Sequence, residues 1–206
     1  MTSADIPTWL ERHLMAYDVV ATVASVIGPG WSAMLRVLHP AHDGHGNEVR
    51  WADIGRRSGR GPVGPETAWQ QVSGVAPHTN PPPDAAFRDE PREGYIPSRL
   101  LADIVSAIDA EHDECGALHW TGWDDYPGDV TTRWCRQDYA ISAGTARTLA
   151  AGDRRVSMLY STAGAWLLAC PLESMSTFVG GDHRIGSALR NSSLEAIDIT
   201  PHTQLP

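Results

Sequence analysis

The segment from Trp31 to Ala41 restricts the folds open to this chain more than any other stretch. Between residues 31 and 38, apolar side chains at every second position alternate with a mixed set that includes Arg36. This period of two is typical of a β-strand. His39-Pro40 ends the run, and we expect a polar loop over 39–47 and a short amphipathic helix over 51–57. The segment therefore predicts a strand with a helix packed beside it.

The rest of the chain predicts further strands and helices. Strand-like patterns cover residues 115–123, 133–141, 155–161, 166–172 and 194–199. Helical patterns cover residues 7–15, 66–72, 97–112 and 182–190, whereas 19–27 suits either a strand or a helix. Because the strands cluster after the first helices and do not alternate with them, we expect an α+β fold. A largely antiparallel sheet of about five to seven strands would be covered on one face by the helices over 97–112 and 182–190.

The chain is expected to form a single domain over residues 1–206, because this length is enough to bury an adequate core. The segment 77–97 is rich in proline and charge and contains Pro81-Pro82-Pro83. It predicts an exposed loop, in which mobility and ordering on binding are open alternatives. The segment is short enough to be a loop within one domain and not a boundary between two.

Charge and cysteine usage narrow the class of protein. With 25 acidic and 16 basic residues, the formal net charge is −9, which argues against a basic face for nucleic acid. The odd number and wide spacing of Cys115, Cys135 and Cys170 favour buried free thiols in a reducing compartment. No apolar run approaches the roughly 18 to 20 residues of a membrane span. We therefore expect a cytoplasmic protein that binds neither nucleic acid nor membranes.

Eight tryptophans against two phenylalanines are an unusual ratio. The four that occupy predicted strands or a helix face are expected in the core: Trp31, Trp51, Trp120 and Trp166. The other four are less clearly placed: Trp9, Trp69, Trp123 and Trp134. Exposed tryptophan and arginine side chains are favoured anchors of protein interfaces, so the sequence points to a protein-binding surface. Its candidate residues are Arg36, His39, Trp69 and Trp123.

Three histidines recur at a spacing of three after the first strand: His39, His42 and His45. Imidazoles are good zinc ligands, but this spacing suits no helical pair, and no Cys-x-x-Cys motif accompanies it. The sequence therefore predicts no metal and no cofactor, and the three histidines are only weak metal-site candidates. For His39, hydrogen bonding at a strand end is the favoured interpretation and catalysis is the alternative.

Asp124 and Asp125 follow Trp123 in an expected loop. Carboxylates beside aromatic rings suit acid–base or sugar-binding chemistry. Adjacent residues of an extended chain point in opposite directions, however, so the two are poor partners for each other. A solvated turn is the favoured interpretation, and the weak catalytic candidates are His39, Asp124 and Asp125.

The segment Ser176-Thr-Phe-Val-Gly-Gly181 precedes the helix expected over 182–190. A glycine-rich turn at a helix N-terminus can bind an anion through backbone N–H groups. No lysine follows, however, and no Walker or Gly-x-Gly-x-x-Gly pattern is present. The sequence favours a turn that needs glycine backbone angles, with Asp182 supporting the helix start.

Several segments, taken in order, resemble a family of uncharacterised proteins found mainly in actinobacteria. They include Leu35-Arg-Val-Leu-His-Pro-Ala41, Val49-Arg-Trp-Ala-Asp-Ile54 and Ser176-Thr-Phe-Val-Gly-Gly181. All 16 basic residues are arginine, which suggests a high-GC genome. Two stretches depart from the family pattern, Pro65-Glu-Thr-Ala-Trp69 and Tyr160-Ser-Thr-Ala-Gly-Ala-Trp166, and this fits a diverged copy carried on a phage or mobile element. The resemblance implies a shared fold and no established activity.

Together these observations favour a non-enzymatic cytoplasmic protein-interaction module, with the partner and the oligomeric state left open. A hydrolase-like enzyme that uses His39 with a loop carboxylate is the second class, and an immunity- or antitoxin-type binding protein is the third. A concave pocket shared by His39 and Asp124 or Asp125 would favour the enzyme. A packed, internally hydrogen-bonded His39 would count against it.

Overall fold

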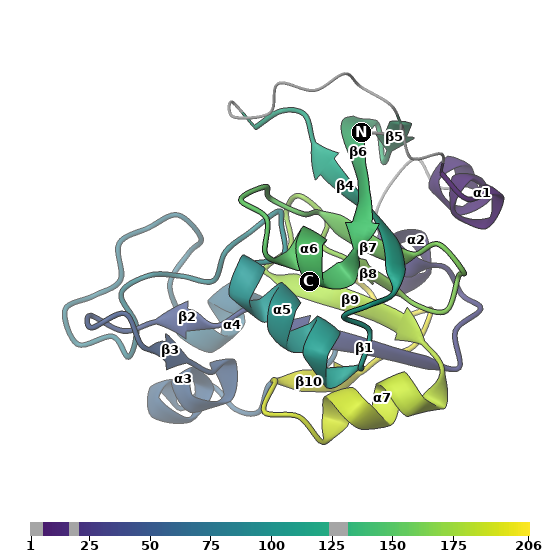
Figure 1. Ribbon diagram of the computed structural model, residues 1–206. Helices are drawn as coiled ribbons and strands as arrows, with labels where there is room; N and C mark the ends of the chain where they lie inside the picture. The colour runs from purple at the N-terminus through teal and green to yellow at the C-terminus, as the bar shows by residue number, and fades with distance from the viewer. Residues whose placement is uncertain (1–5, 17–20, 124–131) are drawn as a thin grey trace.

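The computed structural model describes residues 6–16, 21–123 and 132–206. Its main feature is an antiparallel sheet with the strand order β10-β1-β9-β8-β7-β4-β6-β5 (Figure 1). These strands are β1 Ala33–Leu38, β4 Glu114–Trp120, β5 Thr132–Trp134, β6 Gln137–Thr145, β7 Met158–Ser161, β8 Leu167–Ala169, β9 Ser176–Gly181 and β10 Ala196–Asp198. The α+β class and the antiparallel pairing are confirmed, and the sheet has eight strands where about five to seven were expected.

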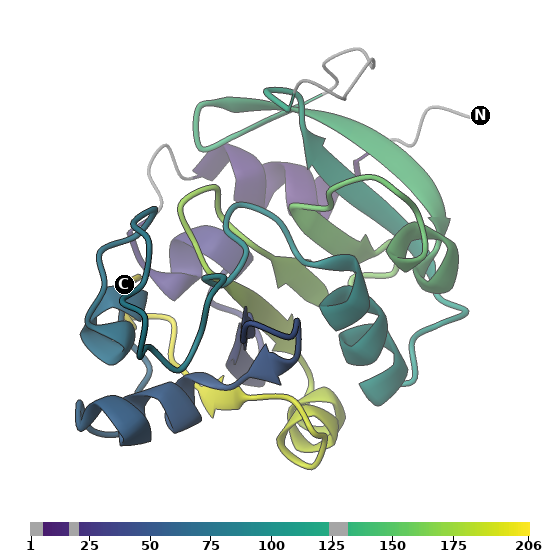
Figure 2. The same ribbon diagram turned by 90° about the vertical axis from the view of Figure 1, so that its left-hand side faces the viewer.

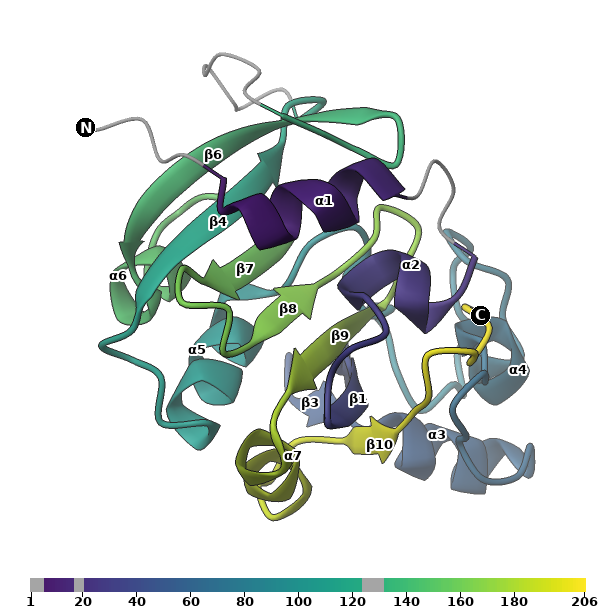
Figure 3. The same cartoon turned by 90° about the vertical axis from the view of Figure 1, so that its right-hand side faces the viewer.

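The helices in the described residues are α1 Thr8–Ala16, α2 Val23–Ile27, α3 Trp51–Ser58, α4 Trp69–Ser73, α5 Ser98–Ala107, α6 Ala146–Ala150 and α7 His183–Arg190. As predicted, α5 and α7 cover the same face of the main sheet, where α6 joins them. The helices α1 and α2 cover the opposite face (Figure 3). None of the helices in the described ranges is both long and apolar enough to cross a membrane.

Alternation along β1 explains why both faces of the sheet carry helices. Leu35 and Val37 pack into the core beneath α5 and α7, and Met34 packs into the core beneath α1 and α2. Successive side chains of a strand point to opposite faces, so a fully buried strand needs cover on both sides. The prediction of helices on one face was therefore incomplete.

A third apolar cluster lies beneath α3 and α4, on the side of the molecule seen in Figure 2. It includes Phe87 from the 77–97 segment, and Ile96 of the same segment is buried beneath α5. Residues 77–80 are exposed, as expected, whereas Phe87, Pro91 and Ile96 are buried. The segment is thus an exposed loop only in part, because apolar side chains anchor its second half.

The turn predicted over 176–181 was wrong. The residues 176–181 form β9, a fully buried strand between β1 and β8, and not a turn. Gly180 and Gly181 are needed there because a Cβ atom would collide with the side chains of Trp31 and Ile185, respectively. The expected support for the next helix is confirmed, since the Asp182 carboxylate accepts a hydrogen bond of 2.9 Å from the Ile185 N–H.

Local pairing also differs from expectation in two places. The strand predicted over 133–141 is a hairpin of β5 and β6 that turns at Cys135 and Arg136, with φ angles of 48° and 65°. The loop predicted over 39–47 contributes to a small second sheet, in which β2 Ala41–His42 pairs with β3 Glu48–Val49. The 19–27 segment, where strand and helix were both open, forms the helix α2 within its described part.

The burial of the tryptophan side chains differs in part from the expectation. Trp51 and Trp166 are buried as predicted, whereas Trp31 and Trp120 are partly exposed. Of the four without a clear place, Trp69 and Trp134 are buried, and Trp9 and Trp123 are partly exposed. Trp69 therefore cannot act as an exposed anchor.

Candidate functional site

Arg36 is a buried cation in the middle of β1, with 1% of its surface exposed. Its Nε donates a hydrogen bond of 2.9 Å to the Oγ of Ser176 on β9. Its Nη1 donates to the carbonyl oxygens of Pro65 and Thr67 at 3.0 and 2.9 Å. All three acceptors are neutral, so they orient the guanidinium without neutralising its charge.

No carboxylate in the described ranges forms an ion pair with Arg36. Burial lowers the pKa of Arg36 to about 10, so the side chain is still charged at neutral pH. A buried charge without a counter-ion is unfavourable. Three of the guanidinium's five N–H donors are engaged by Ser176, Pro65 and Thr67, which leaves the donors of Nη2 for a carboxylate or phosphate. Arg36 is therefore suited to bind an anionic group.

A cavity of about 160 Å³ lies beside Arg36. Its walls include the indole rings of Trp51 at the start of α3 and Trp69 at the start of α4, whose centroids are 5.1 Å apart. The Cζ atom of Arg36 lies 5.3 Å from the Trp51 ring centroid. The Nε1 of Trp51 donates a hydrogen bond of 2.8 Å to the carbonyl oxygen of His39, which holds the ring in place. We call this hollow the Arg36 pocket.

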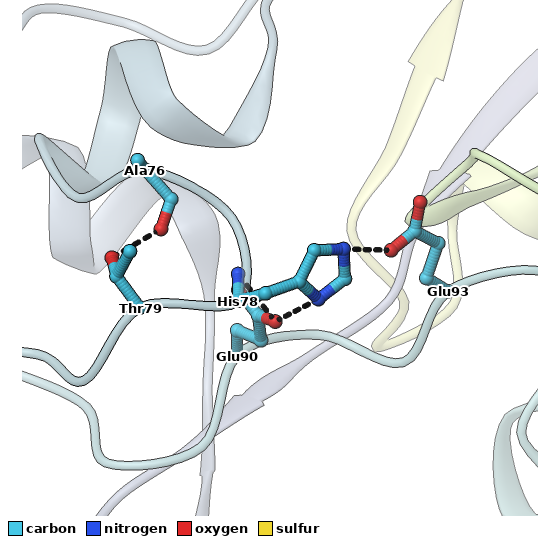
Figure 4. A network of polar contacts seen from close by, with 5 residues as sticks. All are labelled: Ala76, His78, Thr79, Glu90 and Glu93. Carbon is cyan, nitrogen blue, oxygen red and sulfur yellow. Dashed lines mark hydrogen bonds and ion pairs between the residues drawn. The ribbon is translucent and has the colours of Figure 1, made fainter.

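Two carboxylates, those of Glu93 and Glu173, also line the Arg36 pocket. His78 lies between Glu90 and Glu93, with its Nδ1 3.2 Å from Glu90 Oε1 and its Nε2 3.2 Å from Glu93 Oε2 (Figure 4). Burial raises the pKa of Glu93; His78 opposes this rise, and Glu90 and Glu173 add to it. Three carboxylates therefore lie close to one another, and none of them forms an ion pair with Arg36.

A larger hollow of about 430 Å³ adjoins the Arg36 pocket. The two share Glu173, Ser174 and Pro206 among their lining residues. The larger hollow is walled in part by the aromatic residues Trp134 and Tyr139. Together the two hollows form a small compartment that contains Arg36 and a larger one with aromatic residues in its wall.

Of the predicted binding residues, the structure brings Arg36 and Trp69 together in this pocket. Trp69 is 3% exposed, so its ring acts as a wall and not as a protruding anchor. Trp123 lies elsewhere: its ring centroid is 4.4 Å from Arg155 Cζ and 5.0 Å from the Trp120 ring. It is partly exposed, as a surface anchor would be.

His39 is fully buried, and both of its ring nitrogens are engaged. Its Nδ1 lies 2.6 Å from the carbonyl oxygen of Arg92, and its Nε2 lies 2.9 Å from the Oγ1 of Thr177. Burial lowers the pKa of His39 to about 4. His39 thus offers no accessible nitrogen to a ligand, which corrects its selection as a binding candidate.

The histidine-rich loop is organised by Asp43. Its carboxylate accepts hydrogen bonds from the backbone N–H groups of His45 and Asn47 at 2.8 and 2.9 Å. His39 is buried, His42 is partly buried and His45 is exposed. Within the described part of the chain, no group of three or more His, Cys, Asp or Glu side chains is placed to hold a metal ion.

The other two catalytic candidates, Asp124 and Asp125, lie outside the described residues. The acidic residues of the pocket, Glu93 and Glu173, were not selected from the sequence. They belong to two loops that are far apart along the chain, and only the charge of the 77–97 segment signalled one of them.

Comparison with protein-family models, with curated proteins and with solved structures finds no match for this chain.

Proposed function

We propose that this protein is a non-enzymatic protein-binding module and that the Arg36 pocket receives a carboxylate from the partner. The observation that carries the proposal is a buried guanidinium that lines an open cavity and has no carboxylate partner among the described residues. A hydrogen bond between two charged groups is shorter and stronger than one between neutral groups. The low dielectric of a buried site strengthens it further.

The hydrolase alternative depended on His39 as an accessible base. The structure buries His39 and occupies both of its nitrogens, and its lowered pKa reflects that burial. A general base must reach the proton that it abstracts, so His39 does not support this alternative. The acidic side chains at the pocket fit the third class, an immunity- or antitoxin-type protein, as one form of protein binding.

The free thiols of the buried residues Cys115 and Cys170 support a reducing compartment such as the cytoplasm.

Titration calorimetry with short peptides tests the proposal. Peptides that contain an Asp, a Glu or a free C-terminal carboxylate should bind, and the matched Asn, Gln or C-terminal amide peptides should bind much more weakly. Arg36→Met should weaken binding by about 10- to 100-fold, as expected for the loss of a hydrogen bond to a charged group. Arg56→Met is the matched control, because Arg56 is exposed on α3 and pairs with Asp53.

Arg36→Lys covers the case in which the methionine variant fails to fold. It keeps a positive charge but loses the fixed planar geometry that places the Nη2 donors, so it should still weaken binding. Carboxylate peptides that bind equally well to the wild type and to Arg36→Lys would contradict the proposal, as would the absence of binding by any carboxylate peptide.

A further inference from the structure

The Arg36 pocket carries charge of both signs, and the two signs do not neutralise each other. Arg36 forms no ion pair with Glu93 or Glu173, although all three side chains line the same cavity. Glu93 is influenced by His78, Glu90 and Glu173, and Arg36 is not among the charges that shift it. A ligand with an anion at one end and a cation at the other would satisfy both sides.

Glu173 is the carboxylate that is free to take the cation. It is exposed and forms no ion pair with the residues that the structure describes. Only one carboxylate oxygen of Glu93, Oε2, contacts His78 (Figure 4). A cation between Glu93 and Glu173 would therefore gain two carboxylates and relieve their mutual repulsion.

The size of the pocket limits the ligand to about one residue. Its volume is about 160 Å³, well below the roughly 300–1,000 Å³ of a pocket for a drug-sized ligand. An internal peptide segment would have to supply the anion and the cation from two different side chains, and its backbone would have to leave the pocket in two directions. A chain end carries a carboxylate and a side chain on one residue, and it needs only one exit.

The adjoining hollow supplies that exit. It shares Glu173, Ser174 and Pro206 with the Arg36 pocket and has a volume of about 430 Å³. Its aromatic walls, Trp134 and Tyr139, suit an apolar residue. The residues that precede the chain end would lie there.

On this basis, and resting on the proposed carboxylate site, we infer that the protein recognises the carboxyl-terminal residue of a partner chain when that residue is lysine or arginine. The terminal carboxylate binds Arg36 beside the rings of Trp51 and Trp69, which contact each other. The basic side chain binds Glu93 and Glu173.

Four peptides of one sequence test this inference by calorimetry on the full chain: they end in Lys or in Gln, each with a free carboxylate or an amide. The Lys peptide with a free carboxylate should bind most tightly. Replacing Lys by Gln, or the carboxylate by the amide, should each weaken binding about tenfold, which equals 1.4 kcal/mol. Free lysine, which has both charges but no preceding residues, should bind more weakly than the peptide.

The variant Glu173→Gln should lose the preference for Lys over Gln and keep the preference for the free carboxylate. Glu114→Gln is the matched control, since Glu114 is an exposed glutamate at the start of β4, and it should keep both preferences. Equal binding of the Lys and Gln carboxylates, with both still weakened by Arg36→Lys, would overturn the inference and leave the proposed function standing. Equal binding of the carboxylate and amide peptides would overturn both the inference and the proposed function. Free lysine that binds as tightly as the peptide would show a small-molecule site and overturn the chain-end inference.

Discussion

The Nε2 atom of His39 lies 2.9 Å from the Oγ1 atom of Thr177, so one hydrogen bond joins the residue after β1 to the neighbouring strand β9. The Nδ1 atom lies 2.6 Å from the carbonyl oxygen of Arg92. Because a carbonyl oxygen only accepts, Nδ1 carries the proton, and the Thr177 hydroxyl donates to Nε2. Through these two hydrogen bonds the neutral His39 ring connects three segments of the chain.

Acid should therefore destabilise the protein through His39. Burial lowers the pKa of His39 from 6.5 to about 4, so between these values the unfolded chain binds a proton that the folded chain does not. The stabilisation is complete above pH 6.5 and is lost as the pH falls toward 4, by about 3 kcal/mol. Urea unfolding at pH 4.5 and pH 7 measures this loss.

His39→Gln should reduce the pH dependence of unfolding in this window, because glutamine does not titrate there. His13 and His119, whose pKa values burial also lowers, remain in the variant. The difference between the two proteins therefore isolates His39. Equal pH dependence in wild type and variant would show that His39 is not the buried neutral group described here.

Gly180→Ala should destabilise the sheet. A Cβ atom at this position would collide with the indole of Trp31, whose Nε1 donates a hydrogen bond of 2.5 Å to the carbonyl oxygen of Ile27. Overpacking of this kind lowers the free energy of unfolding by about 1–3 kcal/mol. Gly30→Ala is the control, since nothing lies within 4 Å of a Cβ atom there. Calorimetry should show a lower Tm for Gly180→Ala alone; equal Tm values would refute the close contact.

Glu195 should stabilise the start of α3, because its two carboxylate oxygens accept hydrogen bonds of 2.8 Å from the backbone N–H groups of Trp51 and Ala52. The N-cap residue of this helix, Arg50, makes no side-chain cap. Glu195→Ala should lower the free energy of unfolding in urea by about 1–2 kcal/mol. Glu114→Ala, at an exposed glutamate, should change it little. Similar losses in both variants would argue against a capping contribution.

Arg136→Gly should stabilise the β5–β6 hairpin. Arg136 has a φ angle of 65°, a left-handed conformation that is unfavourable for residues with a Cβ atom. After allowing for the greater freedom of glycine in the unfolded chain, the expected gain is about 0.5 kcal/mol. Gln137→Gly, one residue further into β6, should lower the Tm instead. A lower Tm for Arg136→Gly would mean that side-chain contacts of Arg136 outweigh its backbone strain.

Elements whose signals are local could be predicted from the sequence. The alternation around Arg36 predicted β1, and the apolar stripe within 97–112 predicted α5, although the helix ends at Ala107. Asp182 was recognised as the helix support because the N-cap interaction spans only three residues. Each of these signals depends on neighbours along the chain.

Other local patterns led to wrong predictions because tertiary contacts gave these residues a role that differs from their usual one. Gly180 and Gly181 commonly mark a turn, but here they make room for Trp31 and Ile185 against a central strand. Cys135 and Arg136 form a two-residue hairpin turn without the Asn-Gly or Asp-Gly pair that usually signals one.

The sequence by itself determined the α+β class, most of the strands and helices, and Arg36 as a candidate binding residue. Only the tertiary structure decided that His39 is enclosed, that Trp69 forms a wall, and that Arg36 shares a cavity with Glu93 and Glu173. The physical reason is distance along the chain. Periodicity and capping act over a few residues, whereas the pocket joins side chains from β1, α3, α4 and two loops, which meet only when the apolar clusters pack.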